Sequence, residues 1–231
     1  MKKKIELAMG VCLIVSAFFL ARQGAVYVQS TKTTEKEICI VVDAGHGGID
    51  PGKIGVNDAK EKDINLTLAL QLKKLLEQKN IKVVLTRDSD AGLYTEDCTN
   101  KKAADMQNRC QIITDANPVF TVSIHQNSYT TPDIKGAQVF YYGQSVGGEK
   151  LAKILQKSLI SRVDPKNKRE AKANESYYLL KKTPTPTVIV ECGFLSNPEE
   201  AALLLDTDYQ SKLVRAIYMG IVEYLEEEDL L

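Results

Sequence analysis

The sequence predicts a single α/β domain built on a mostly parallel (mixed), twisted sheet of about six strands, with helices on both faces. Short runs rich in β-branched residues alternate along the chain with longer segments of helical periodicity, and this alternation is typical of a parallel sheet covered by helices. The 231 residues, 44% of them hydrophobic, suffice for one well-packed domain beside an N-terminal targeting segment. The sequence contains no internal repeat.

The predicted strands are short apolar runs bounded by polar or turn-forming residues. They cover residues 38–42, 81–86, 119–124, 137–142, 177–180 and 187–191. The first predicted helix spans 64–78, where apolar residues at 64, 68, 72, 75 and 76 form one face. Further helices are expected at 103–115, at 149–163 and as a C-terminal pair within 198–227.

The N-terminus has the composition of an export signal. It begins with Met-Lys-Lys-Lys, and an apolar run follows from Leu7 to Ala21. A basic start and an apolar stretch of this length are typical of such signals. We therefore predict a signal peptide or uncleaved signal anchor over 1–25, a linker over 26–36 and the folded domain over 37–231. Export across the cytoplasmic membrane is expected, with membrane contact only through the N-terminal segment.

Charge and cysteine content exclude some classes of protein. The net charge is zero, which gives no electrostatic basis for binding nucleic acid. The chain has five cysteines, too few for a disulfide framework. Cys39 and Cys192 fall in predicted strands and are interpreted as small apolar side chains of the core. A pairing of Cys98 with Cys110 stays open.

Both histidines and one glutamate stand at the ends of predicted strands. His46 follows the strand at 38–42, His125 follows the strand at 119–124, and Glu191 ends the strand at 187–191. Ligands of open α/β sheets bind beyond the carboxyl ends of the strands, so these three side chains are expected to meet. Two imidazoles and a carboxylate form one of the ligand sets of catalytic zinc, which leaves one position for water. The pattern therefore predicts a divalent-metal site.

Two glutamates compete for the place of third ligand. One is Glu191; the other is Glu61, which opens the helical segment soon after the His46 loop. We prefer Glu61, because Glu191 is then free to act as a general base. The structural alternative is a capping box from Asp58 to Glu61, in which Glu61 only supports the helix start.

Neighbouring residues are candidates for supporting roles. Asp43 is a candidate to accept a hydrogen bond from a metal-bound imidazole. Arg87 is a candidate contact for a peptide carboxylate, with a solvated surface arginine as the alternative. Asn127 could bind a ligand or the substrate, but a turn-forming role is equally compatible with its place. Glycines 45, 47 and 48 are expected to let the backbone bend so that His46 faces the metal.

The polar loop at 88–102 is the longest in the sequence and holds Tyr94. We interpret it as a candidate wall of a substrate groove, with an ordinary surface excursion as the equal alternative.

Two rival sites are excluded by the residues themselves. The loop from Gly47 to Lys53 has the spacing of a P-loop, but Ile54 replaces the magnesium-binding hydroxyl and Pro51 removes a backbone donor. A nucleophilic Cys192 is disfavoured, because adjacent side chains of a strand point to opposite faces and Glu191 is expected to face the site.

Five strings, in order from about Ile38 to the C-terminal helix, resemble the zinc-dependent N-acetylmuramoyl-L-alanine amidases of the Amidase_3 family. They are Val-Val-Asp-Ala-Gly-His46-Gly-Gly, Glu61-Lys-Asp-Ile-Asn-Leu, Thr-Arg87-Asp, Val-Ser-Ile-His125-Gln-Asn127 and Val-Ile-Val-Glu191-Cys-Gly-Phe-Leu-Ser-Asn. The resemblance implies one Zn²⁺ per chain, held by His46, Glu61 and His125, with Glu191 as the catalytic acid and base. It further implies that the substrate is peptidoglycan, cut between the lactyl group of N-acetylmuramic acid and L-alanine.

Three stretches narrow the resemblance to the spore-cortex, germination-specific members, the CwlD-type amidases. They lie at 92–97, at 125–129 followed by 135–142, and at 190–200. This likeness implies a first step toward muramic-δ-lactam, and a place in the cell wall or the forespore intermembrane space. An activator protein is a candidate partner beside the glycan strand and its stem peptide. Two other functions stay open: a non-catalytic cell-wall binding protein and a zinc peptidase acting within the stem peptide.

Overall fold

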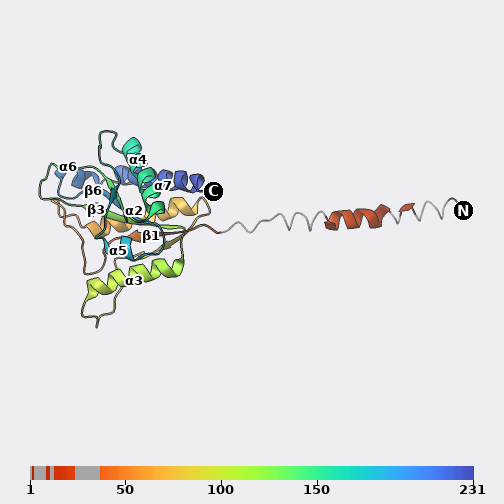
Figure 1. The fold of residues 1–231 in the computed structure, drawn as a ribbon, viewed down its shortest axis with the longest axis horizontal. Helices are drawn as coiled ribbons and strands as arrows, with labels where there is room; N and C mark the ends of the chain where they lie inside the picture. Colours follow the sequence, from red (N-terminus) through yellow and green to blue (C-terminus); the bar gives the residue numbers. More distant parts are fainter. Residues whose placement is uncertain (1, 3–8, 11–12, 24–36) are drawn as a thin grey trace. The chain divides into compact units, whose positions relative to one another are not determined.

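The computed structural model describes residues 2, 9–10, 13–23 and 37–231 (Figure 1). The chain divides into two compact units, Met1–Glu37 and Ile38–Leu231. In the first unit residues 13–23 are helical. Among the described residues, no helix combines the length and apolarity needed to cross a membrane. The signal segment at 1–25 lies in part, and the linker at 26–36 entirely, outside the described residues, and both stay predictions.

One six-stranded sheet forms the centre of the second unit, in the order β2-β1-β3-β6-β4-β5. Strands β2, β1, β3 and β6 are parallel, β4 is antiparallel to β6, and β5 is parallel to β4. This confirms the predicted mostly parallel, mixed sheet. The strands are β1 (Cys39–Ala44), β2 (Lys82–Leu85), β3 (Phe120–Asn127), β4 (Gln138–Tyr141), β5 (Lys172–Ala173) and β6 (Thr187–Phe194).

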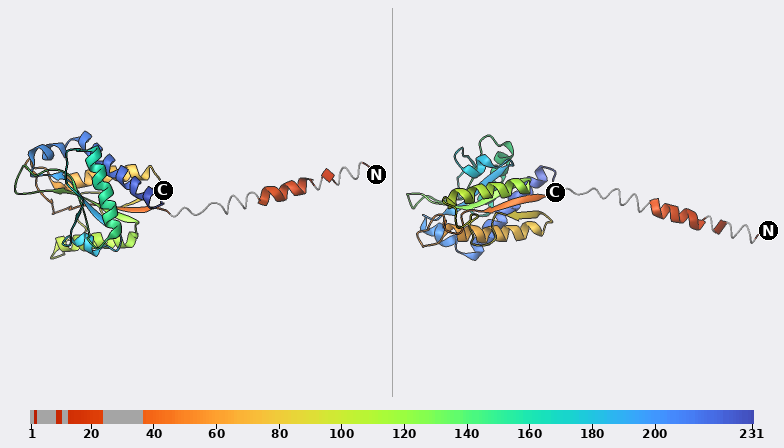
Figure 2. Two further views of the ribbon diagram at one scale, coloured as in Figure 1. Left: turned by 45° about the horizontal axis from the view of Figure 1, so that its top comes forward. Right: turned by 90° about the horizontal axis from the view of Figure 1, so that it is seen from below.

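Helices cover both faces of the sheet, as predicted. Figures 1 and 2 show α3 and α5 on one face and α2, α4 and α7 on the other. The helices are α2 (Glu61–Glu77), α3 (Lys101–Ala116), α4 (Val146–Arg162), α5 (Tyr178–Lys182), α6 (Pro198–Leu203) and α7 (Thr207–Glu227). The predicted C-terminal pair is α6 and α7, which begin after the N-caps Asn197 and Asp206.

The predicted strand at 177–180 is wrong. Residues Tyr178–Lys182 form the short helix α5, and the edge strand is β5, a few residues earlier. Leu179 and Leu180 are both buried but belong to different apolar clusters, the first with Val41 and the second with Phe140. A short apolar run does not by itself distinguish a strand from a buried helical turn.

The central strands are buried along their length, which explains their continuous apolar runs. All eight residues of β6 are buried, and His125 of β3 is the register partner of Glu191 of β6. The parallel arrangement places the carboxyl ends of β1, β3 and β6 at one edge of the sheet, where the candidate site forms.

Candidate active site

The His46 loop follows β1 and is held by two buried arginines. The guanidinium of Arg87 donates to Ala44 O at 2.9 Å and to Gly45 O at 3.0 Å. Arg109 of α3 donates to Ala44 O at 2.7 Å and also to His46 O. These bonds accompany a left-handed backbone at His46, with φ of 62°, a conformation that is uncommon outside glycine. The loop is therefore fixed by one residue of the loop after β2 and one residue of α3.

The glycines beside His46 permit this bend. Gly47 and Gly48 have φ of 138° and 56°, which glycine adopts without a steric penalty. Gly45 is needed for a different reason, because a Cβ there would lie 2.2 Å from Nε2 of His125. The loop thus requires glycine both for its turn and for close contact with the second histidine.

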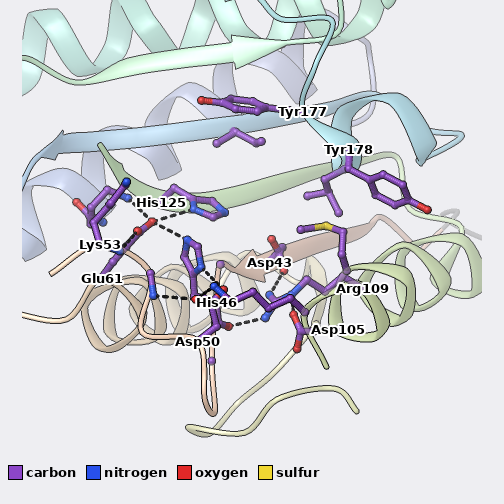
Figure 3. A pocket seen from close by; sticks show the side chains of 18 of the residues that line it. Asp43, His46, Asp50, Lys53, Glu61, Asp105, Arg109, His125, Tyr177 and Tyr178 are labelled. Carbon is purple, nitrogen blue, oxygen red and sulfur yellow. Dashed lines mark hydrogen bonds and ion pairs between the residues drawn. The ribbon is translucent and has the colours of Figure 1, made fainter. Parts of the chain in front are cut away.

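Three side chains that suit a metal ion converge beyond the strand ends (Figure 3). Oε1 of Glu61 lies 2.9 Å from Nδ1 of His125 and 3.2 Å from Nε2 of His46. The ligand atoms of the three residues all lie within 4.8 Å of one another. Two imidazole nitrogens and one carboxylate oxygen are a donor set that zinc accepts, with a fourth position left for water. The residues present therefore fit a catalytic zinc ion.

The carboxylate of Glu61 is aimed at the histidines and does not cap its own helix. Glu61 is the first residue of α2, and the N-cap Lys60 makes no side-chain cap hydrogen bond, so the capping-box alternative is wrong. Its Oε2 accepts from the backbone N–H of Lys53 at 2.7 Å. Burial opposes ionisation, but hydrogen bonds and charge from both imidazoles hold the pKa of Glu61 well below its usual range.

Glu191 faces the same place without comparable partners. Its side chain lines the cavity at the site, and it is only 7% exposed. Its Oε2 has no hydrogen-bond partner among the described residues. Burial and the charge of Glu61 raise the pKa of this carboxyl, the two imidazoles lower it, and the net result is a pKa of about 7. Glu191 is therefore suited to accept and release a proton near neutral pH.

A cavity of about 610 Å³ opens over these residues. Its apolar and aromatic lining includes Met106, Tyr177, Tyr178, Leu179 and Ile189. Tyr94 and Lys102 also line the cavity, which supports the interpretation of 88–102 as a wall. A cavity of this size admits a ligand of several linked groups.

The supporting role expected of Asp43 falls to another residue. Asp43 accepts hydrogen bonds from Thr86, Ser123 and Arg109, and within the described part of the chain neither imidazole donates to it. Nδ1 of His46 instead lies 2.9 Å from Oδ2 of Asp50.

The sequence analysis missed Asp50 and Arg109. Asp50 could have been found by its place four residues after His46 in the same loop. No motif or spacing in the sequence indicates the role of Arg109.

Arg87 and Asn127 are placed by their own hydrogen bonds. Arg87 is 4% exposed, and its guanidinium donates to backbone carbonyls of residues 44, 45, 62 and 89, so it does not reach a substrate. This contradicts both sequence-based alternatives for Arg87. Asn127 lines the cavity, while its Oδ1 accepts from the N–H of Ser128 at 2.8 Å, which supports the turn-forming role.

The four cysteines within the described residues give no sign of chemistry. Cys98 and Cys110 are free thiols, so the open pairing is not formed. Cys192 packs in the main hydrophobic core while the adjacent Glu191 lines the cavity, which confirms the predicted alternation. Burial raises the pKa of the Cys192 thiol, which further disfavours a nucleophilic thiolate.

Comparisons with known proteins agree with this geometry. A family model described as N-acetylmuramoyl-L-alanine amidase matches residues 40–223. The germination-specific N-acetylmuramoyl-L-alanine amidase of Bacillus subtilis is 36% identical over 192 residues, which cover 82% of this chain and 80% of that protein.

Solved structures give the same result. The CwlD amidase of Clostridioides difficile, solved with the GerS lipoprotein, has a TM-score of 0.80 and 42% identity, covering 82% of this chain and 99% of that one. The amidase AmiC2 of Nostoc punctiforme has a TM-score of 0.72 and 33% identity, covering 82% and 98%. The chain therefore belongs to the N-acetylmuramoyl-L-alanine amidase family Amidase_3.

Proposed function

We propose that this protein is a zinc-dependent amidase that hydrolyses the bond between the lactyl group of N-acetylmuramic acid and L-alanine in peptidoglycan. The observation that carries the proposal is the buried Glu191 carboxyl, with an unpaired oxygen, beside three residues that suit zinc. Family membership supports the choice of bond.

The residues of the site divide the chemistry between them. His46, Glu61 and His125 would hold one zinc ion, which when bound supplies Lewis acidity that acidifies a water and polarises the scissile carbonyl. Glu191 takes a proton from the water that attacks the lactyl carbonyl. It then delivers that proton to the L-alanine nitrogen as the C–N bond breaks. The products are a lactyl carboxylate on the sugar and a peptide with a free amino end.

The relatives support a narrower setting. The Bacillus subtilis relative is germination-specific, and the Clostridioides difficile relative is a CwlD amidase solved with the GerS lipoprotein. We infer that this chain acts on spore cortex, as the first step toward muramic-δ-lactam, and that an activator protein is a partner. Export by the N-terminal signal, to the cell wall or the forespore intermembrane space, completes the proposal.

Mass spectrometry of muropeptides tests the proposal. Purified protein with added zinc acts on isolated peptidoglycan, and a chelator-treated sample and a Glu191→Gln variant serve as controls. Peptide-free muramic acid and free peptides that begin with L-alanine are expected only with the active protein. Shortened stems that stay attached to sugar would indicate a peptidase instead. Binding of peptidoglycan without cleavage, with and without an activator, would indicate a non-catalytic wall protein.

A further inference from the structure

Asp50 connects the first histidine of the site to helix α3. We propose that Asp50, held in place by Lys102, is a positioning residue that determines which nitrogen of His46 faces the metal and thereby sets metal affinity. The inference rests on the metal site of the proposed function and concerns how that site is kept ready for the ion.

The two nitrogens of His46 have different surroundings. Nδ1 lies 2.9 Å from Oδ2 of Asp50, while Nε2 lies 3.2 Å from Oε1 of Glu61, on the side of the metal site. A neutral imidazole carries one N–H and one lone pair, and an ionised carboxylate only accepts hydrogen bonds. Both nitrogens thus face a carboxylate, and Asp50 is the nearer acceptor. When Glu61 serves as a metal ligand, Asp50 is the acceptor that remains, and it selects the form with the proton on Nδ1. The lone pair of Nε2 is then directed at the position of a metal ion.

Asp50 is itself held from two sides. Its Oδ1 lies 2.9 Å from Nζ of Lys102, at the start of α3. Its backbone pairs with that of Gly47 through two hydrogen bonds, of 3.0 and 3.1 Å. The carboxylate is thus fixed by its own turn and by a helix that lies outside the loop (Figure 3). Lys102 is 70% exposed, and exposed ion pairs contribute little energy, so its effect should be smaller than that of Asp50.

His125 is oriented in a different way. Its Nδ1 lies 2.9 Å from Oε1 of Glu61, so it is this nitrogen that faces the metal site. Its Nε2 lies against Gly45, where a Cβ would be 2.2 Å away, and has no hydrogen-bond partner in the described part of the chain. Packing orients His125, and a charged hydrogen bond orients His46. Loss of Asp50 should therefore disturb one ligand and leave the other in place.

Zinc affinity of the full-length chain, measured by competition with a chromogenic chelator, tests the proposal. Asp50→Ala should weaken zinc binding by about 10- to 100-fold, the range observed when the partner of a metal-binding histidine is removed. Asp50→Asn keeps an acceptor without charge and should fall between Asp50→Ala and the wild type. Lys102→Met should weaken binding by less than Asp50→Asn. Lys101→Met and Asp88→Asn are matched controls, because within the described residues neither side chain forms a hydrogen bond or ion pair with Asp50 or His46. Both variants should bind zinc like the wild type.

A second measurement reports the imidazoles directly. The chain has only two histidines, so long-range ¹⁵N–¹H NMR spectra of the metal-free protein resolve the protonated nitrogen of each. We expect the proton mainly on Nδ1 of His46 in the wild type, because Asp50 is the nearer carboxylate. In Asp50→Ala, Glu61 is the remaining acceptor, so the proton should move toward Nε2, with His125 unchanged. An unchanged His46 spectrum, or zinc affinity in Asp50→Ala equal to that of Asp88→Asn, would overturn the proposal. If Asp50→Ala fails to fold, Asp50→Asn and Lys102→Met still decide it.

The outcomes separate this proposal from the proposed function. If the wild type cleaves peptidoglycan and Asp50→Ala binds zinc as tightly as the wild type, only the positioning role is refuted. If Asp50→Ala binds zinc more weakly but the wild type cleaves no peptidoglycan, only the proposed amidase activity is refuted.

Discussion

Asp43 and Glu191 are both buried acidic residues near the C-terminal ends of the central strands, yet their pKa values are shifted in opposite directions. Asp43 is 1% exposed and accepts hydrogen bonds at both oxygens. Burial raises its pKa, but Arg109, Ser123 and Thr86 together lower the pKa to about 2. Glu191 lacks such partners, and its burial raises the pKa to about 7.

The difference shows what separates a structural carboxylate from a reactive one. Burial disfavours the charged form of both groups, and only hydrogen bonds and opposite charge compensate for it. At Asp43 the compensation is complete, and the charged group joins β1 to Arg109 of α3. At Glu191 one oxygen stays unpaired, so its proton can move at neutral pH. The two regions should therefore respond differently to the same loss of charge.

The largest expected effect is on catalysis at Glu191. Glu191→Gln should lower the rate of peptide release by about 10²- to 10⁴-fold, because an amide cannot take up the proton of the attacking water. Its free energy of unfolding should not fall, because the change removes a buried group without partners. Initial rates and urea unfolding measure the two effects. Glu199→Gln is the control, since Glu199 is an exposed partner of Lys135. More than a tenth of wild-type activity in Glu191→Gln would contradict the assignment.

At Asp43 the same kind of change should act on stability. Asp43→Asn leaves the buried guanidinium of Arg109 with Asp105 as its remaining charged partner. Removing one partner of a buried ion pair costs up to about 3–5 kcal/mol. Urea unfolding measures the loss. Asp115→Asn removes an exposed carboxylate of α3 and should change the free energy of unfolding by less than ~0.5 kcal/mol. An equal, small effect of both variants would refute the structural role of Asp43.

Acid should remove the contribution of Asp43 progressively. The folded pKa of about 2 lies below the ordinary aspartate pKa of 3.8, so this contribution is present above pH 4 and is lost as the pH falls toward 2. The shift corresponds to about 2 kcal/mol. Urea unfolding between pH 5 and pH 2 should show this slope in the wild type and a shallower one in Asp43→Asn. If the free energy of unfolding falls equally steeply with pH in both proteins, the acid sensitivity comes from residues other than Asp43.

Taken per pH unit, the smallest expected effect is the pH dependence of the rate set by Glu191. The carboxylate form accepts the proton, and the raised pKa of about 7 means that this form is depleted below neutral pH. Initial rates should fall by about tenfold per pH unit well below pH 7. Zinc content measured at each pH separates this effect from loss of the metal. A rate that stays constant down to pH 5 with zinc bound would contradict the raised pKa.

The features that could be predicted from the sequence are those marked by a local pattern of residues. Strand ends were visible as apolar runs followed by polar residues, and these placed His46, His125 and Glu191 together. The strand prediction at 177–180 was wrong because Leu179 and Leu180 pack into separate apolar clusters, and no local pattern of residues indicates this.

The support around the site depends on contacts between distant residues. Arg109 appears in the sequence as a polar helix residue, and only the packing of α3 against β1 brings it to Asp43. Asp43, in turn, stands at a strand end like the histidines, so its position predicted a contact with them. Its actual partners are Thr86 just after β2, Ser123 of β3 and Arg109 of α3, and only the arrangement of these elements in space brings them to Asp43.

The most direct test of the central claim follows oxygen from the solvent into the products. Peptidoglycan is digested in H₂¹⁸O with the zinc-loaded wild type, and the fragments are weighed by mass spectrometry. Attack on the lactyl carbonyl predicts one ¹⁸O in the lactyl carboxylate of muramic acid and none in the released peptide, with no release by Glu191→Gln. Label in a peptide carboxylate would show that the enzyme cuts within the stem, and would contradict the amidase account.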